Sequence, residues 1–117
     1  MNIGNLFADD MPPAQGERFD VVLEHRNLVV ERIVSSGDVT PRTYVQPQDE
    51  WVVLVKGAAL LDVDGAPVEL GAGDHVFLPA RVPHTVRRVS EGALWLAVHL
   101  HPDRTPRESA TGHKEPS

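Results

Sequence analysis

Cysteine is absent from this chain of 117 residues. Without thiols the protein can form no disulfide, no thiolate metal site and no cysteine nucleophile. Aromatic residues are also scarce, at 5% of the chain, whereas apolar residues as a whole reach 41%. That apolar content is ordinary for a globular protein, and the length suits one domain but not two. We therefore expect a single domain whose hydrophobic core forms without covalent cross-links.

Basic residues are few and scattered, and acidic residues outnumber them. Lys and Arg total 11 against 17 Asp and Glu, which gives a formal net charge of −6. An acidic chain without a basic stripe is a poor partner for a phosphate backbone, so we expect no nucleic-acid binding. No apolar run approaches the roughly 18 residues of a membrane span, and residues 1–7 lack the pattern of a secretory signal. These features predict a cytoplasmic protein that does not contact membranes.

From residue 19 onward, short runs rich in Val and Leu alternate with turns that contain Gly, Pro or Asp. Asp64-Gly65 is a hairpin signal, because both central residues of such a turn favour positive φ. Residues 1–18 are predicted to form an arm, 19–101 a β-barrel domain, and the polar, proline-containing segment 102–117 a disordered tail. The predicted strands span residues 19–25, 28–34, 42–46, 50–56, 58–63, 68–70, 75–79, 84–89 and 93–101.

Regularly spaced short strands without an amphipathic helix favour an all-β sandwich or barrel. One segment, Trp51-Val52-Val53-Leu54-Val55, is apolar on both faces of its strand. That pattern fits a strand covered on both sides, with the second cover supplied by another sheet or by a partner subunit. We accordingly expect Trp51 to occupy a core position.

A spaced set of residues follows the turn at Gly73. Gly73, Pro79 and His84 stand at the intervals of a pattern that reads glycine, five residues, proline, one residue, glycine, two residues, histidine, three residues, asparagine. Arg81 stands at the second glycine position and Arg88 at the asparagine position. This pattern is the second sequence motif of the cupin family, which the chain resembles. The resemblance implies an all-β, double-stranded β-helix (jelly-roll) cupin barrel.

The first cupin motif is preserved in part. Glu50 and Gly57 match its glutamate and closing glycine with six residues between them, and Gly37 is the opening glycine. The two histidines of the motif are absent, since Tyr44 and Gln46 stand at their positions. The resemblance covers residues 37–101, which is more than half of the chain.

Cupins typically hold one divalent metal through three histidines and a glutamate. Carried onto this sequence, the resemblance implies metal ligation by Gln46, Glu50 and His84, with Tyr44 at the pocket wall. Such a donor set suits Mn, Fe, Ni or Zn. In the alternative reading, His84 is hydrogen-bonded to Glu50 in a barrel without a metal, where the pair can still serve as acid and base. For Gln46 the alternative is a solvated turn residue beside Pro47.

Two further residues are candidates for binding a cofactor or substrate. His99 shares a strand face with His101 and could replace a missing ligand, unless it belongs to an exposed strand end. Arg88 follows His84 by four residues, so strand alternation predicts that both face the pocket, where an arginine would either pair with Glu50 or hold a carboxylate or phosphate. The alternative for Arg88 is an outward-facing charge.

The sequence thus predicts a small metal-dependent cupin enzyme that acts on an oxygenated or carboxylated small molecule. Glu50 and His84 would transfer the proton in isomerisation or lyase-type chemistry. The alternative is a non-catalytic cupin that binds or senses a small molecule, with a weak or absent metal site. A homodimer is expected, because small cupins resembling this chain pair through their first strands, here residues 19–34.

Overall fold

A computed structural model describes residues 2–102. The tail predicted to be disordered lies, from residue 103 on, outside the described residues. The strands found in the described part of the chain, in order, are β1 (Glu17–His25), β2 (Leu28–Ser35), β3 (Thr43–Tyr44), β4 (Asp49–Lys56), β5 (Ala58–Val63), β6 (Ala66–Gly71), β7 (His75–Leu78), β8 (His84–Val89) and β9 (Ala93–Leu100). The predicted all-β jelly-roll fold is confirmed.

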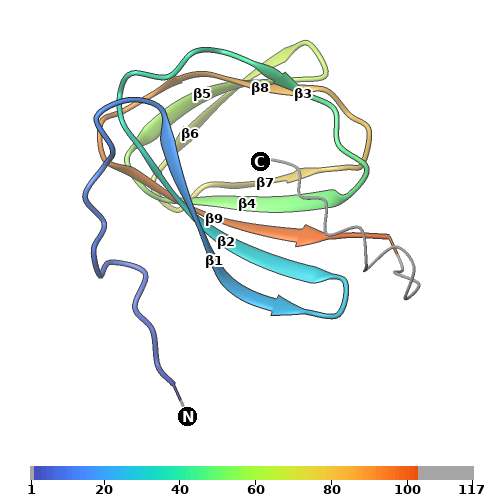
Figure 1. Cartoon of the computed structure of the whole chain (residues 1–117). Helices are drawn as coiled ribbons and strands as arrows, with labels where there is room; N and C mark the ends of the chain where they lie inside the picture. Colours follow the sequence, from blue (N-terminus) through green and yellow to red (C-terminus); the bar gives the residue numbers. More distant parts are fainter. Residues whose placement is uncertain (1, 103–117) are drawn as a thin grey trace.

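The strands form two antiparallel sheets that face one another and enclose the interior (Figure 1). One sheet has the order β1-β2-β9-β4-β7, and the other has the order β3-β8-β5-β6. Strands that are distant in sequence are therefore neighbours, as β2 and β4 both pair with β9. Residues 2–102 contain no helix long and apolar enough to cross a membrane.

Two turns require residues that tolerate a positive φ. Asp64 and Gly65 both have positive φ, at 51° and 82°, as the predicted hairpin turn between β5 and β6 requires. Gly57, between β4 and β5, has a φ of 102°, and an added Cβ would lie 2.7 Å from the Ser90 side chain and 2.9 Å from that of Ala93. Only glycine fits this position, because it combines positive φ with close approach of another chain segment.

The interior changes character along the barrel. On β4 the inward positions run from Glu50 through Val52 to Leu54, and the paired inward positions of β9 run from His99 to Trp95. The apolar end packs as a core of Ile33, Val52, Leu54, Ala59, Leu61, Leu70, Leu78, Val89, Ala93, Trp95 and Ala97. Burial of these side chains drives folding, whereas the other end of the same two strands carries buried polar groups.

Two details of the strand predictions are wrong. Trp51 is 37% exposed and lies on the outside of the five-stranded sheet, with its ring 5.4 Å from that of His75. Val52 and Leu54 take the inward positions instead, because alternate residues of a strand point to opposite faces. The strand expected over residues 42–46 is limited to Thr43–Tyr44, since the chain leaves the ladder before Pro47.

The amino-terminal arm is tied to the barrel. Arg32 on β2 donates hydrogen bonds to the carbonyl oxygens of Leu6, at 3.0 Å, and Ala8. The same guanidinium pairs with Asp20 at 2.7 Å, and this hydrogen-bonded pair lowers the pKa of the Asp20 carboxyl. The arm is thus held against the barrel by hydrogen bonds from the Arg32 side chain to main-chain carbonyl oxygens of the arm.

Candidate functional site

Six polar side chains converge inside the barrel at the end where β4 begins and β9 ends. Glu50, His84 and His99 are 3%, 5% and 2% exposed, and the two glutamines are as deeply buried. We call this group the interior polar cluster: Glu31, Gln46, Gln48, Glu50, His84 and His99.

The segment before β4 supplies both glutamines through an inverted pattern. Gln46, Gln48 and Glu50 are buried, whereas Val45, next to Gln46, is 60% exposed. Alternation with a period of two therefore places polar side chains inside and an apolar one outside. The segment is held by the loop before β8, because the Arg81 amide donates to the Gln46 carbonyl at 2.8 Å.

Glu50 lies at the centre of the cluster. Its Oε1 accepts a hydrogen bond from Gln46 Nε2 at 2.8 Å and lies 3.9 Å from Nε2 of His84. Its Oε2 lies 3.8 Å from Nε2 of His99. Each carboxylate oxygen thus faces a different imidazole, at a distance too long for a direct hydrogen bond.

The two histidines are oriented by different partners. Nδ1 of His84 lies 3.4 Å from the Val82 carbonyl, which favours a proton on Nδ1 and turns the Nε2 lone pair toward Glu50. Nε2 of His99 lies 3.1 Å from Oε1 of Glu31, and its Nδ1 lies 3.3 Å from the Gln48 amide nitrogen. His99 is therefore engaged on both ring nitrogens, while His84 keeps Nε2 directed into the barrel.

A depression of about 490 Å³ lies beside Tyr44, and Glu17, Phe19, Thr40 and Arg42 are among its other lining residues. The Tyr44 ring also stacks on the His84 ring, with centroids 5.8 Å apart. The side chain of Tyr44 thus contacts the depression on one side and the cluster on the other. Burial raises the pKa of the Tyr44 hydroxyl, so it stays protonated as a hydrogen-bond donor at neutral pH.

Glu17 is a further interior carboxyl. Its Oε2 accepts a hydrogen bond from the Ser35 hydroxyl at 2.5 Å, and that hydroxyl in turn accepts one from Trp95 Nε1 at 3.1 Å. Burial, reinforced by the charge of Glu50, raises the pKa of Glu17 above its usual value. The interior therefore disfavours additional negative charge.

The structure brings most of the predicted site residues together. Gln46, Glu50 and His84 lie together as expected, and the solvated-turn alternative for Gln46 is wrong because this side chain is 3% exposed. The structure also places His99 in the cluster. Sequence reasoning missed Gln48, although the alternation of buried positions through residues 46, 48 and 50 was a signal that could have found it.

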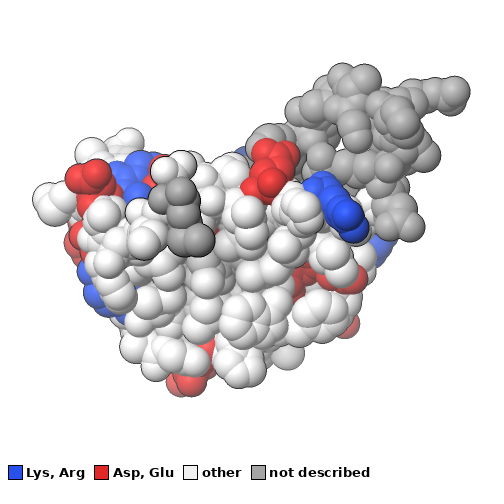
Figure 2. Space-filling view, turned by 90° about the horizontal axis from the view of Figure 1, so that it is seen from below, with Lys and Arg blue, Asp and Glu red and all other residues white. Residues whose placement is uncertain are grey.

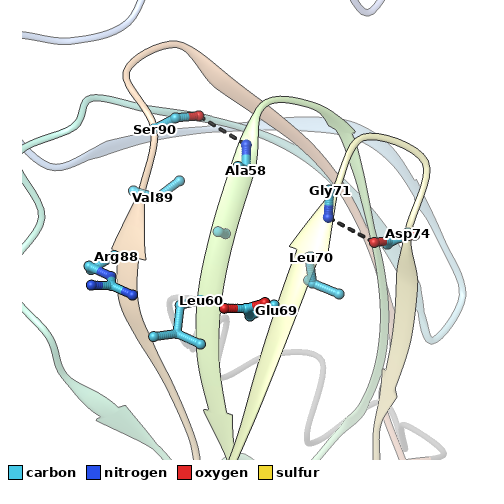
Figure 3. A pocket seen from close by; sticks show the side chains of 10 residues that line it. Ala58, Leu60, Glu69, Leu70, Gly71, Asp74, Arg88, Val89 and Ser90 are labelled. Atoms are coloured by element: carbon cyan, nitrogen blue, oxygen red, sulfur yellow. Dashed lines mark hydrogen bonds between the residues drawn. The ribbon is translucent and has the colours of Figure 1, made fainter.

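Arg88 does not face the interior, so the parity argument for it is wrong. β8 carries one extra residue opposite β5, since Leu60 pairs with Arg88 and Leu61 pairs with Val86. A bulge of this kind shifts the alternation, and Arg87 and Arg88 are both exposed. Arg88 instead borders a depression of about 630 Å³ near Leu60 and Glu69 (Figure 3). That open surface shares no residue with the interior polar cluster.

The donor set does not fit a resident metal. Within residues 2–102, no group of three or more His, Asp or Glu side chains is arranged to hold a metal ion. Oε1 of Glu50 already accepts the Gln46 amide, and Nε2 of His99 faces Glu31. Of the three residues predicted as metal ligands, Gln46 and Glu50 are thus hydrogen-bonded to each other, and only Nε2 of His84 is left to act as a strong donor to late first-row ions.

Comparison with known proteins agrees with this fold. The sequence model of the cupin domain family matches residues 30–102. A search of curated proteins finds no match to the chain. A protein of Ralstonia eutropha JMP134, provisionally named a mannose-6-phosphate isomerase, is 40% identical with a TM-score of 0.80, over 87% of this chain and 100% of that one. The protein TT1209 of Thermus thermophilus is 21% identical, with a TM-score of 0.73 over 87% and 100% of the chains. KdgF of a Halomonas species is 16% identical, with a TM-score of 0.68 over 79% and 84%.

Proposed function

This chain belongs to the cupin domain family, and we propose that it is a small enzyme that moves a proton on an oxygenated small molecule inside the barrel. One observation carries the proposal. Glu50 lies between two imidazoles that face its two carboxylate oxygens at 3.9 and 3.8 Å, and all three groups are at least nine-tenths buried. Titratable groups packed together in a buried interior are typical of proton-transfer sites.

His84 is the group best placed to take the proton. Its Nε2 lone pair faces the interior, and Glu50 lies where it would stabilise the imidazolium that forms. In the proposed reaction, His84 removes a proton from a carbon next to a carbonyl group. The protonated ring then returns it to the neighbouring atom in an isomerisation, or to a leaving oxygen in an elimination. His99, held between Glu31 and Gln48, lies on the other side of Glu50 and is not assigned a proton-transfer role.

No step in this chemistry passes through a metal, because the donor set does not fit one. The isomerase name of the Ralstonia protein supports proton transfer as the reaction type. That name is the only support from function among the relatives described, since likeness below 25% identity shows the fold alone.

Exchange of carbon-bound protons with solvent deuterium tests the proposal directly. The full chain is incubated in deuterated buffer with a panel of aldoses, ketoses and short hydroxyketones, and exchange is followed by NMR. We expect exchange on at least one compound, unaffected by EDTA and reduced about 10²-fold or more by His84→Ala and by Glu50→Gln. His75→Ala, at an exposed histidine of β7, is the matched control and should exchange at the wild-type rate.

Two results would contradict the proposal. Loss of exchange on chelation would show that a metal is required. Binding of a compound at the cluster without exchange of any proton would favour the alternative reading, in which the barrel binds or senses a small molecule without chemistry.

A further inference from the structure

The two buried glutamines each have an amide oxygen without a hydrogen-bond partner in the described part of the chain. Oε1 of Gln46 and Oε1 of Gln48 are buried from solvent and accept no hydrogen bond, and the two side chains are 3% and 1% exposed. Buried polar atoms are nearly always paired, so a buried orphan calls for an explanation.

The orientation of each amide follows from its neighbours. The Gln46 amide nitrogen donates to Glu50 at 2.8 Å, and a reversed amide would place an oxygen against a carboxylate oxygen. The Gln48 amide nitrogen faces Nδ1 of His99, and Nε2 of the same ring faces the Glu31 carboxylate. The carboxylate favours a proton on Nε2, which leaves Nδ1 as the acceptor for the Gln48 amide nitrogen. Both amide oxygens are therefore the unpaired ends, and each needs a donor.

The interior is rich in hydrogen-bond acceptors. Its acceptors include the carboxylates of Glu17, Glu31 and Glu50 besides the two orphan amide oxygens, and no Lys or Arg belongs to the interior polar cluster. Within residues 2–102, the buried side-chain atoms left without a partner are neutral amide oxygens rather than carboxylate oxygens. A molecule that completes this hydrogen bonding must bring donors of its own.

We propose that the ligand of the interior polar cluster is an uncharged polyol, such as a sugar, whose hydroxyl groups donate to the amide oxygens of Gln46 and Gln48. This inference rests on the proposed function, because it names the class of molecule that enters the same site. It makes Gln46 and Gln48 the residues that determine specificity.

The charge of the site favours an uncharged polyol over anionic or cationic ligands. A phosphate or carboxylate would enter a space that already holds three carboxyl groups, where like charges repel in a medium of low dielectric. A primary ammonium would lose its hydration on burial, while Glu31 and Glu50 already accept hydrogen bonds or face imidazoles. A hydroxyl supplies the missing donor without either cost.

The depression beside Tyr44 suits the same kind of molecule. Its lining combines the aromatic rings of Phe19 and Tyr44 with the opposite charges of Glu17 and Arg42. Arg42 lies over the Tyr44 ring, 5.2 Å from its centroid. A polyol can stack its apolar face on an aromatic ring while its hydroxyls both donate and accept, which a uniformly charged ligand cannot do.

Three matched hexoses test the inference on the full chain: mannose, mannose 6-phosphate and mannosamine. Their binding is followed by NMR through the imidazole signals of His84 and His99. We expect mannose to bind at least tenfold more tightly than the other two. Gln46→Met and Gln48→Met, which keep side-chain length but remove the acceptor, should each weaken mannose binding at least fivefold. Glu69→Met, at an exposed position of β6 outside this depression, should change it less than twofold.

The outcomes separate the two proposals. Tighter binding of the phosphate or the amine would overturn the polyol inference and leave the proton-transfer site intact. Mannose binding that both Met variants retain would also overturn it, and thermal unfolding of the variants shows that they fold. If none of the three sugars, nor any compound of the exchange panel, perturbs either imidazole, the interior is not a ligand site and both proposals fail.

Discussion

Glu50 and His99 are paired residues on β4 and β9, and both side chains point into the barrel, with Oε2 of Glu50 3.8 Å from Nε2 of His99. The same His99 nitrogen lies closer to Glu31, at 3.1 Å. One imidazole thus stands between two carboxylates contributed by neighbouring strands on either side of β9. The interior polar cluster therefore draws carboxylates from β2 and β4 and an imidazole from β9 between them.

Replacement of the two tryptophans by Ala should separate the core from the surface. Trp95 is 3% exposed and donates to Ser35, so Trp95→Ala is expected to cost about 3–5 kcal/mol of the free energy of unfolding. Trp51 lies outside the barrel, and Trp51→Ala should cost no more than about 1–2 kcal/mol in dilute solution. Urea unfolding of both variants measures this, and equal losses would contradict the outward placement of Trp51.

Glu17→Gln should make the protein more stable than the wild type at high pH, where the wild type loses stability. The folded state raises the pKa of Glu17, chiefly by burial, so the native state binds this proton more tightly than the unfolded state does. In the wild type, protonated Glu17 therefore makes its full contribution to the free energy of unfolding below the pKa of the unfolded state. That contribution is lost as pH rises through the pKa of the folded state. The amide does not titrate, so the variant keeps its stability.

Urea unfolding at about pH 4 and about pH 8 checks this difference. Glu69→Gln, at an exposed position of β6, is the control and should show the same stability as the wild type at both pH values. A Glu17→Gln variant that gains nothing at the higher pH would show that the carboxyl is not penalised by burial.

Arg81→Gly should stabilise the loop before β8. Arg81 stands where the cupin motif has glycine and adopts a φ of 69°, in the left-handed region. In this region a residue with a side chain destabilises the folded state by roughly 1–2 kcal/mol. Replacement by glycine removes this strain, but the larger loss of backbone entropy of glycine on folding offsets part of the gain. We expect a net gain of about 0.5–1 kcal/mol in the free energy of unfolding. Arg81→Ala keeps the strain and should gain nothing; equal gains in both variants would implicate the arginine side chain instead.

The homodimer expected from the sequence remains a prediction, and the structure adds a surface for it. The outer side of the five-stranded sheet exposes Leu23, Trp51, Phe77 and Leu100. Seen from below, the middle of this face carries few charged side chains (Figure 2). An apolar face with few charges can pack on an identical copy across a two-fold axis without repulsion between like charges.

Light scattering at about ten micromolar should give the mass of a dimer for the wild type and of a monomer for Phe77→Lys. Val45→Lys, at an exposed apolar position outside this sheet, is the matched control and should stay dimeric. A monomeric wild type, or a Phe77→Lys variant that still dimerises, would argue against this face.

Local sequence patterns determined most of the architecture. Alternating Val and Leu runs separated by turn residues were enough to place most of the strands, and Asp64-Gly65 predicted its hairpin, because these features depend on neighbours within a few residues. The spaced motif that ends at His84 predicted the cupin fold. Glu50 and His84 were likewise identified from motif positions alone.

Only the tertiary structure decided which side chains meet. His99 reaches Glu50 because β9 is inserted between β2 and β4, a pairing of strands distant in sequence that no local pattern specifies. Arg88 turns outward because one extra residue in β8 reverses the alternation on which the sequence argument relied. Trp51 and Val52 are both apolar, so hydrophobicity could not say which one faces the core. That choice follows from the sheet register, which is fixed by long-range pairing and by burial of one face.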